Sequence, residues 1–160
     1  MSRTANSLER ITQRVIRCEQ CPRLRTYCQA ITREKRAAFR TETYWAKPVP
    51  GYGDPRARIA IVGLAPAAHG ANRTGRMFTG DGTSGSSGFL ARALHATGLA
   101  AQPHSESRDD GQRLLDTWMT AAVRCAPPDN KPTPAEMANC FGYLAAELTA
   151  LPRLRVVVAL

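Results

Sequence analysis

Residues 58–83 read RIAIVGLAPAAHGANRTGRMFTGDGT, and this stretch decides the fold class. Its first six residues form a short apolar run that ends in Gly63, which is typical of a strand buried on both faces of a parallel sheet. A long glycine-rich loop follows. Two further apolar runs, at 117–123 and 155–160, alternate with helical patterns at 84–97 and 133–148. This alternation predicts an α/β protein, a three-layer α/β/α sandwich with a short parallel central sheet.

The N-terminal third differs from this core in pattern and in charge. Residues 7–17 and roughly 22–40 have the apolar spacing of helices, and residues 44–55, rich in proline and glycine, predict an ordered loop. The first fifty residues hold eleven Lys or Arg and four Asp or Glu, against 22 and 13 in the whole chain, whose net charge is +9. This basic flank favours a polyanionic partner such as nucleic acid, although a solvated helix face would carry the same charge.

The length of 160 residues suits one domain, residues 1–160, which we divide into a helical and loop flank at 1–57 and an α/β core at 58–160. No apolar run approaches the roughly 20 residues that span a bilayer, and the first residues lack a secretory segment. These features exclude membrane proteins and secreted scaffolds, and we expect a cytoplasmic protein. Because the sequence ends on what reads as a buried strand, we also expect it to be a fragment of a longer chain, truncated at its C-terminus.

Five cysteines without an export signal favour a metal or cluster site over a disulfide framework. Cys18 and Cys21 form a C-x2-C pair, and Cys125 and Cys140 are separated by fourteen residues. Structural zinc usually takes two closely spaced ligand pairs, whereas iron–sulfur clusters tolerate scattered thiolates, so the spacing leaves both metals open. Cys28 falls on the apolar face of a helix, where a free thiol packs as a small hydrophobic side chain.

The glycine-rich loop lies where a parallel sheet builds its active site, beyond the carboxyl ends of the strands. Successive backbone N–H groups in such a loop can hold an anion or an oxyanion. The loop matches neither a Walker A sequence nor a dinucleotide fingerprint. Asp81 is its sole carboxylate and Phe78 its sole aromatic ring, so the loop could orient water and stack a planar base. A helix cap for Asp81 and a core position for Phe78 are the alternatives.

Several motifs, in this order along the chain, resemble the family 5 (B-type) uracil-DNA glycosylases. They are CEQC at 18–21, YWAKPVPG at 44–51, GLAPAAHG at 63–70, NRTGR at 72–76, FTGD at 78–81 and AVRCAPP at 122–128. The resemblance covers essentially the whole chain. It implies the uracil-DNA-glycosylase-like α/β/α fold and a hydrolase that removes uracil and other deaminated bases from DNA at the start of base excision repair. The implied partner of this monomer is double-stranded DNA with the damaged base flipped out, in the nucleoid of a prokaryote.

The resemblance also assigns roles to residues. Asp81 would orient the hydrolytic water and stabilise the cationic sugar as the base leaves. Phe78 would stack on the base. The absence of a lysine nucleophile from the motif implies a monofunctional hydrolase and not a lyase. The other implied base-binding residues are Gly63, Leu64, Ala65, Pro66, Ala67 and His69.

A 4Fe–4S cluster with a structural role is implied as well, and its ligands would be Cys18, Cys21, Cys125 and Cys140. One departure stands out: the family continues past the third strand to a His-Pro-Ser motif that binds the base, and no such motif precedes Leu160. Loss of one such donor costs about 10²–10³ in rate. A weak or inactive iron–sulfur DNA-binding module is therefore the alternative, and a zinc-stabilised interaction domain is a third hypothesis.

Overall fold

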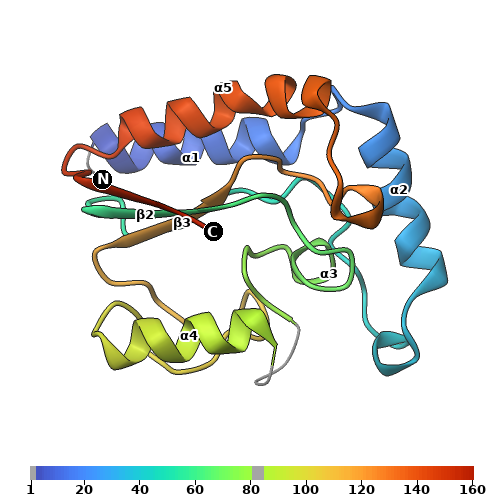
Figure 1. The fold of residues 1–160 in the computed structure, drawn as a ribbon, viewed down its shortest axis with the longest axis horizontal. Helices are drawn as coiled ribbons and strands as arrows, with labels where there is room; N and C mark the ends of the chain where they lie inside the picture. Colours follow the sequence, from blue (N-terminus) through green and yellow to red (C-terminus); the bar gives the residue numbers. More distant parts are fainter. Residues whose placement is uncertain (1–2, 81–84) are drawn as a thin grey trace.

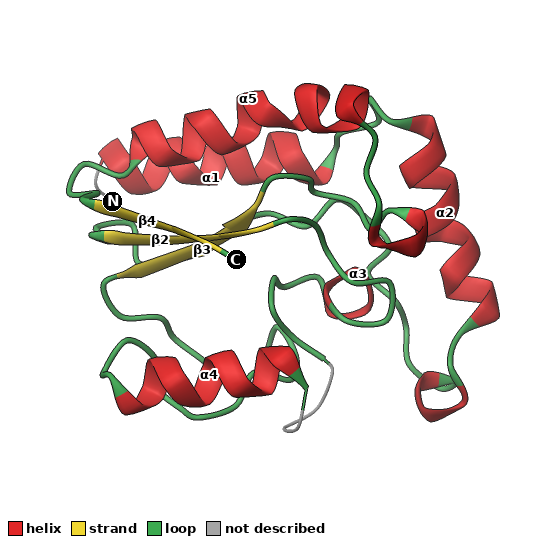
Figure 2. Cartoon of the chain, in the orientation of Figure 1, coloured by secondary structure: helices red, strands yellow, loops and turns green. Residues whose placement is uncertain are grey.

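A four-stranded sheet forms the centre of the molecule (Figures 1 and 2). The computed structural model describes residues 3–80 and 85–160. In the sheet order β1-β3-β2-β4, β2 pairs in parallel with both β3 and β4, whereas β1 pairs antiparallel with β3. The strands are β1 (Tyr52–Gly53), β2 (Ile59–Gly63), β3 (Thr117–Ala121) and β4 (Val156–Ala159).

The three predicted strands are confirmed and pair in parallel, and the sheet has a fourth, antiparallel strand, β1, that the sequence did not predict. The short edge strand β1 lies inside the segment that the sequence predicted to be a loop. Gly53 explains how it pairs: its φ is +141°, and a Cβ there would lie 2.3 Å from the carbonyl oxygen of Thr117. Only glycine can approach β3 this closely. The glycine content that predicted a loop at 44–55 therefore includes the residue that allows β1 to pair.

Helices cover both faces of the sheet, which confirms the three-layer α/β/α architecture (Figure 1). α1 and α5 lie side by side on one face, and α4 lies on the other. No helix in the described part of the chain is both long and apolar enough to cross a membrane. The helices are α1 (Arg3–Ile16), α2 (Pro22–Glu34), α3 (Ala71–Thr74), α4 (Ser86–Ala96) and α5 (Pro134–Ala150), with 3₁₀ turns at Ala37–Phe39 and Pro128–Asn130.

Successive side chains of β3 point to opposite faces of the sheet and pack into two separate hydrophobic cores. Trp118 of β3 packs with Val15 of α1, whereas its neighbour Met119 packs with Ile61 of β2 and Leu94 of α4. This alternation fixes which helix covers which face.

Local signals set the helix ends. Thr133 and Glu136 form the capping box that the sequence predicted: the Thr133 hydroxyl accepts from the Glu136 N–H, and the Glu136 carboxylate accepts from the Thr133 N–H. The predicted helix over 22–40 is shorter, because α2 ends at Glu34. Lys35 leaves the helical conformation, and its ammonium donates to the backbone oxygen of Glu42 at 2.7 Å.

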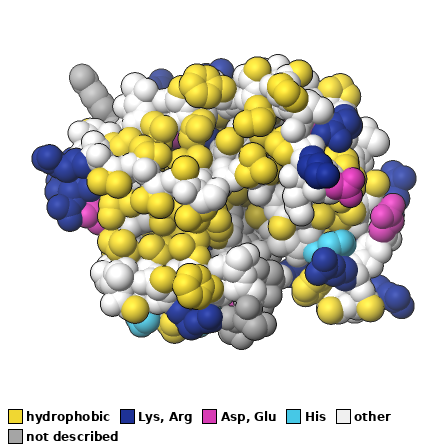
Figure 3. Space-filling view, in the orientation of Figure 1, with side chains coloured by type: hydrophobic (Ala, Val, Ile, Leu, Met, Phe, Trp, Pro, Cys, Tyr) yellow, Lys and Arg dark blue, Asp and Glu magenta, His cyan; other side chains and the backbone are white. Residues whose placement is uncertain are grey.

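β4 differs from the buried strand that the sequence predicted. It lies at the edge of the sheet, and Val156, Val157 and Val158 are 50%, 50% and 39% exposed. The prediction of burial is wrong because no element of the described residues packs over this edge. Figure 3 shows hydrophobic side chains gathered over the sheet on this face of the molecule.

Candidate functional site

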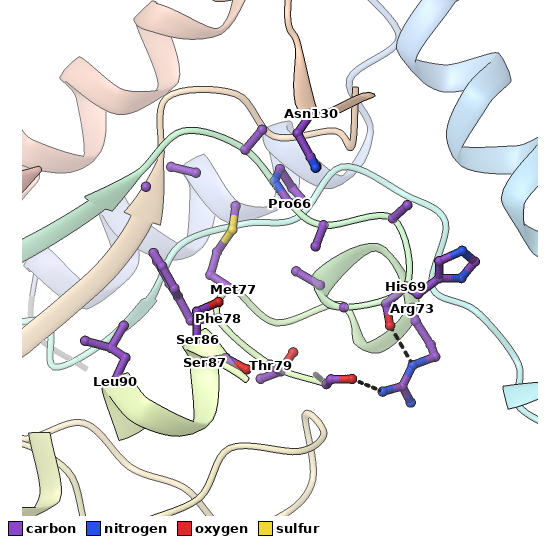
Figure 4. Close-up of a pocket in the computed structure, with 18 of the residues that line it drawn as sticks. Pro66, His69, Arg73, Met77, Phe78, Thr79, Ser86, Ser87, Leu90 and Asn130 are labelled. Atoms are coloured by element: carbon purple, nitrogen blue, oxygen red, sulfur yellow. Dashed lines mark hydrogen bonds between the residues drawn. The ribbon is translucent and has the colours of Figure 1, made fainter. Parts of the chain in front are cut away.

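A cleft of about 1370 Å³ opens beyond the carboxyl ends of β2 and β3. Its walls come from the loop after β2, the start of α4 and the turn before α5 (Figure 4). The β2–β3 pairing continues into this loop, because the Val123 N–H donates to the Leu64 oxygen at 2.9 Å. The sheet therefore holds the first residues of the loop rigidly at the cleft.

The structure brings all of the predicted base-binding residues together in the cleft. All seven positions proposed for base contact line the cleft, and the carboxylate proposed for catalysis, Asp81, lies outside the described residues. The seven are Gly63, Leu64, Ala65, Pro66, Ala67, His69 and Phe78.

Phe78 occupies an unusual position in this cleft. Its φ is +54°, a left-handed conformation that costs a bulky residue about 1–3 kcal/mol. The flanking residues Met77 and Thr79 are buried, and the Thr79 hydroxyl donates to the Arg76 oxygen at 2.6 Å, so the surrounding structure maintains the strain. The ring lies against the end of β2: a Cβ at Gly63 would stand 2.7 Å from Cζ of Phe78.

Arg73 joins the two ends of the loop, a role that the sequence analysis missed. Its Nε donates to the His69 oxygen and its Nη2 to the Gly80 oxygen, both at 2.9 Å. Nη1 pairs with the Glu42 carboxylate, and the guanidinium stacks 3.9 Å from the centre of the Phe39 ring. In the sequence this arginine is one of many basic residues, and nothing there marks it as buried.

His69 lies at the opposite end of the cleft from Phe78, and its ring points away from that residue (Figure 4). Its Nδ1 shares a hydrogen bond of 2.9 Å with the hydroxyl of Tyr44. Partial burial lowers the pKa of His69, and the charges of Arg36 and Arg73 lower it further, so the imidazole is neutral at pH 7.

Glu106, Ser107 and Asp110 also line the cleft, and Arg76 holds their segment in place. The guanidinium donates to both carboxylate oxygens of Asp110, at 2.9 and 2.6 Å. Burial alone would raise the pKa of Asp110, but the Arg76 bonds and backbone N–H donors, including that of Glu106, hold it well below its usual range. The segment therefore presents an ionised carboxylate that is fully occupied by Arg76 and the backbone.

The cysteines gather between the N-terminal flank and the core. Cys21, Cys28, Cys125 and Cys140 share one buried cluster, and Cys18, three residues before Cys21, is half-buried. No group of three or more metal-ligating side chains among residues 3–80 and 85–160 has an arrangement that could hold a metal ion.

Cysteine thiolates are nevertheless the ligands that iron–sulfur clusters and structural zinc take, and four cysteine side chains lie in this cluster. Burial raises the pKa of Cys140 to about 11 and also raises that of Cys21. The hydrogen bond with Cys28, together with burial, raises the pKa of Cys125. Thiols so placed stay protonated unless a cation lies among them. Cys28 is fully buried, as the sequence predicted, and its Sγ lies 3.6 Å from the Ala126 oxygen.

A buried ion pair supports the loop that carries Cys125. Arg124 donates to both oxygens of Glu147, at 3.1 and 2.9 Å, and both side chains are 1% exposed. Glu147 also accepts from the hydroxyl of Thr120 and from the backbone N–H of Gly51. This network joins α5, β3 and the 44–51 loop.

Comparison with known proteins places the chain in a family. The sequence model of the uracil DNA glycosylase superfamily matches residues 50–160. The chain is 53% identical over 152 residues to the type-5 uracil-DNA glycosylase of Thermus thermophilus, covering 95% of this chain and 67% of that protein. It is 48% identical over 147 residues to the type-5 uracil-DNA glycosylase of Pyrobaculum aerophilum, and the match covers 92% of this chain and 62% of that protein. It is 46% identical over 161 residues to the type-5 uracil-DNA glycosylase of Mycobacterium leprae, and the match covers 100% of this chain and 69% of that protein.

The chain thus spans about two thirds of the length of these three relatives. The matched part includes the three larger strands, the cleft and the loop that lines it. The chain belongs to the uracil-DNA glycosylase superfamily, and within it to the type-5 glycosylases.

Proposed function

We propose that this protein is a monofunctional DNA glycosylase that hydrolyses the N-glycosidic bond of uracil and other deaminated bases in DNA. The observation that carries the proposal is the cleft itself. In a chain 53% identical to a type-5 uracil-DNA glycosylase, the 63–70 segment lines a cavity in which a strained aromatic ring lies over the end of a central strand.

The cleft suits a base that has left the DNA helix. A glycosylase that acts on duplex DNA flips the target nucleotide into a pocket and offsets the lost stacking there. Phe78 supplies a ring for the flipped base, and the backbone groups of Gly63 to Ala67 contact its edge. Because Gly63 lacks a Cβ, the ring and the strand end approach closely and form a narrow surface for a planar ligand.

The chemical step is assigned to water and Asp81. As the bond between C1′ and the base nitrogen breaks, the base takes the bonding electron pair and leaves as an anion. Asp81 orients the water that adds to C1′, receives its proton, and stabilises the positive charge that develops on the sugar. Backbone N–H groups of the 63–67 segment stabilise the departing anion.

The partner is double-stranded DNA, bound by a monomer. The net charge of +9, concentrated in the first fifty residues, favours contact with phosphates and predicts that affinity falls as salt concentration rises.

Four cysteines are proposed to hold a 4Fe–4S cluster that fastens the N-terminal flank to the core: Cys18, Cys21, Cys125 and Cys140. The test compares Cys125→Ser with Cys28→Ser, since both residues are buried in the same cluster. Cys125→Ser should lose iron and melt at a lower temperature, whereas Cys28→Ser should keep its iron. Equal iron loss from both variants, or zinc in the wild-type protein, would show that the assignment is wrong.

The activity itself is tested by the release of free uracil from a labelled duplex, with protein in excess. Asp81→Asn should lower the single-turnover rate by about 10²–10⁴-fold, because the general base is lost. Phe78→Ala should lower it about 10–100-fold through lost stacking. Phe141→Ala is the matched control, since that ring lies on α5 and is 65% exposed. No release by the wild-type protein, or equal rates for wild type and Asp81→Asn, would refute the proposal.

A further inference from the structure

The hydrogen-bonded pair of Tyr44 and His69 is a part of the cleft to which the proposed chemistry gives no role. Tyr44 belongs to the loop before β1 and is 6% exposed, whereas His69 is half-exposed and lines the cleft. The rings meet edge to face, with centroids 6.0 Å apart and an interplanar angle of 85°. A buried tyrosine from one segment thus holds a histidine from another.

The donors and acceptors in this contact can be assigned. The Tyr44 hydroxyl carries a single hydrogen, and among the described residues His69 Nδ1 is the one hydrogen-bond partner of that hydroxyl. Tyr44 therefore donates to Nδ1 over 2.9 Å. With Nδ1 accepting, the ring proton of neutral His69 resides on Nε2. His69 then presents an N–H donor and not a lone pair.

The charges around His69 favour an anionic acceptor. The positive charges of Arg36 and Arg73 lie close enough to the imidazole to lower its pKa, and the Arg36 side chain is exposed on the cleft wall. Lys35 lies over the Tyr44 ring, 5.8 Å from its centre. The nearby carboxylates are Glu34 and Glu42, and Glu42 is paired with Arg73.

We propose that His69 donates its Nε2–H to a phosphodiester oxygen of the DNA strand, and that Tyr44 is the positioning residue that fixes this tautomer. The inference rests on the proposed function, because it names the group on DNA that this end of the cleft binds. It differs from the base contact predicted for His69: the imidazole points away from Phe78, on which the base is proposed to stack (Figure 4). A ligand spanning the cleft therefore meets Phe78 with its base and His69 with its backbone.

Duplex binding distinguishes a phosphate contact from a base contact. The test compares the Kd of a normal duplex with that of a duplex carrying an uncleavable uracil analogue. His69→Ala should raise the Kd of both duplexes about tenfold, because a hydrogen bond to a charged group is lost. The effect should be the same for the two duplexes, because phosphates occur in every duplex. Tyr44→Phe, which removes only the hydroxyl, should weaken both about threefold. His95→Ala, at an exposed position of α4, is the matched control and should change neither.

Two further readouts separate this role from a merely structural one. His69 is a neutral donor, so His69→Ala should leave the salt dependence of binding unchanged, whereas Arg36→Ala should lower the slope of log Kd against log salt by about one. Nitrogen-15 NMR should show the Nε2–H tautomer of His69 in the wild-type protein and a mixture of tautomers in Tyr44→Phe.

The outcomes that overturn the inference are distinct from failure of the proposed function. Weakening by His69→Ala of the uracil duplex alone would make His69 a base contact, and unchanged affinity for both duplexes would remove it from DNA binding. An Nδ1–H tautomer in the wild-type protein would overturn the role of Tyr44. If the wild-type protein releases uracil and any of these results is found, only this inference fails; if the wild-type protein neither binds DNA nor releases uracil, both fail.

Discussion

The ring of Phe78 lies over Gly63, so closely that a Cβ at position 63 would stand 2.7 Å from Cζ of the ring. The contact joins the carboxyl end of the central strand β2 to the far part of the cleft loop. Phe78 reaches it through a left-handed backbone, with φ of +54°. The strand end and the ring thereby act as one surface, and substitutions at either residue test the account of the cleft.

Gly63→Ala should damage the cleft without unfolding the sheet. The added methyl group must displace the Phe78 ring, and such overpacking costs about 1–3 kcal/mol of unfolding free energy. We expect that loss in urea unfolding, together with a fall in the single-turnover rate of uracil release. Gly142→Ala is the control, because a Cβ there meets nothing within 4 Å and alanine favours the α5 helix. If Gly63→Ala behaves like Gly142→Ala in both measurements, the contact does not shape the site.

Glu147→Gln should be among the most destabilising single changes in the chain. It leaves Arg124 charged and buried without its carboxylate, and breaking such a pair costs about 3–5 kcal/mol. Arg58→Gln removes an ion pair whose arginine side chain is 53% exposed, and it should lower the unfolding free energy far less. Urea unfolding of both variants at pH 7 provides the comparison, and equal losses would contradict the assignment of Glu147 as the centre of a buried network.

The pair of Arg23 and Glu136 predicts a pH-dependent contribution to stability. The hydrogen bonds from Arg23 lower the pKa of Glu136 from the ordinary 4.5 to about 2, although burial opposes the shift. The stabilisation is therefore fully present above about pH 4.5 and is lost as the pH falls toward 2. The difference in unfolding free energy between wild type and Glu136→Gln should shrink from pH 7 to pH 3. A difference that stays constant over this range would contradict the shift.

Local patterns predicted the fold well where one element's own residues decide it. The apolar run ending at Gly63 and the capping box of Thr133 and Glu136 both appear as expected. The antiparallel strand β1 was missed, because its pairing depends on how closely Gly53 approaches Thr117, a contact between segments far apart in the chain.

The site shows the same division. The loop motif predicted which residues line the cleft, because the loop follows β2 directly and so begins at the carboxyl edge of the sheet. The sequence could not show that Arg73 is buried where it closes the loop, because Glu42 and Phe39 of a separate segment hold it there. Nor could it show that Tyr44, from the loop before β1, reaches His69. It also could not show that Cys28 lies against Cys125, since a helix and a distant loop meet there.

The central claim is that the cleft receives a uracil flipped out of duplex DNA. The most direct test is a crystal structure of the protein with a duplex that carries a 2′-fluorinated deoxyuridine, whose N-glycosidic bond resists hydrolysis. The account predicts that the uracil lies outside the helix with its plane against the Phe78 ring and its edge toward residues 63–67. A uracil that remains stacked within the duplex, or that binds the protein outside this cleft, would contradict it.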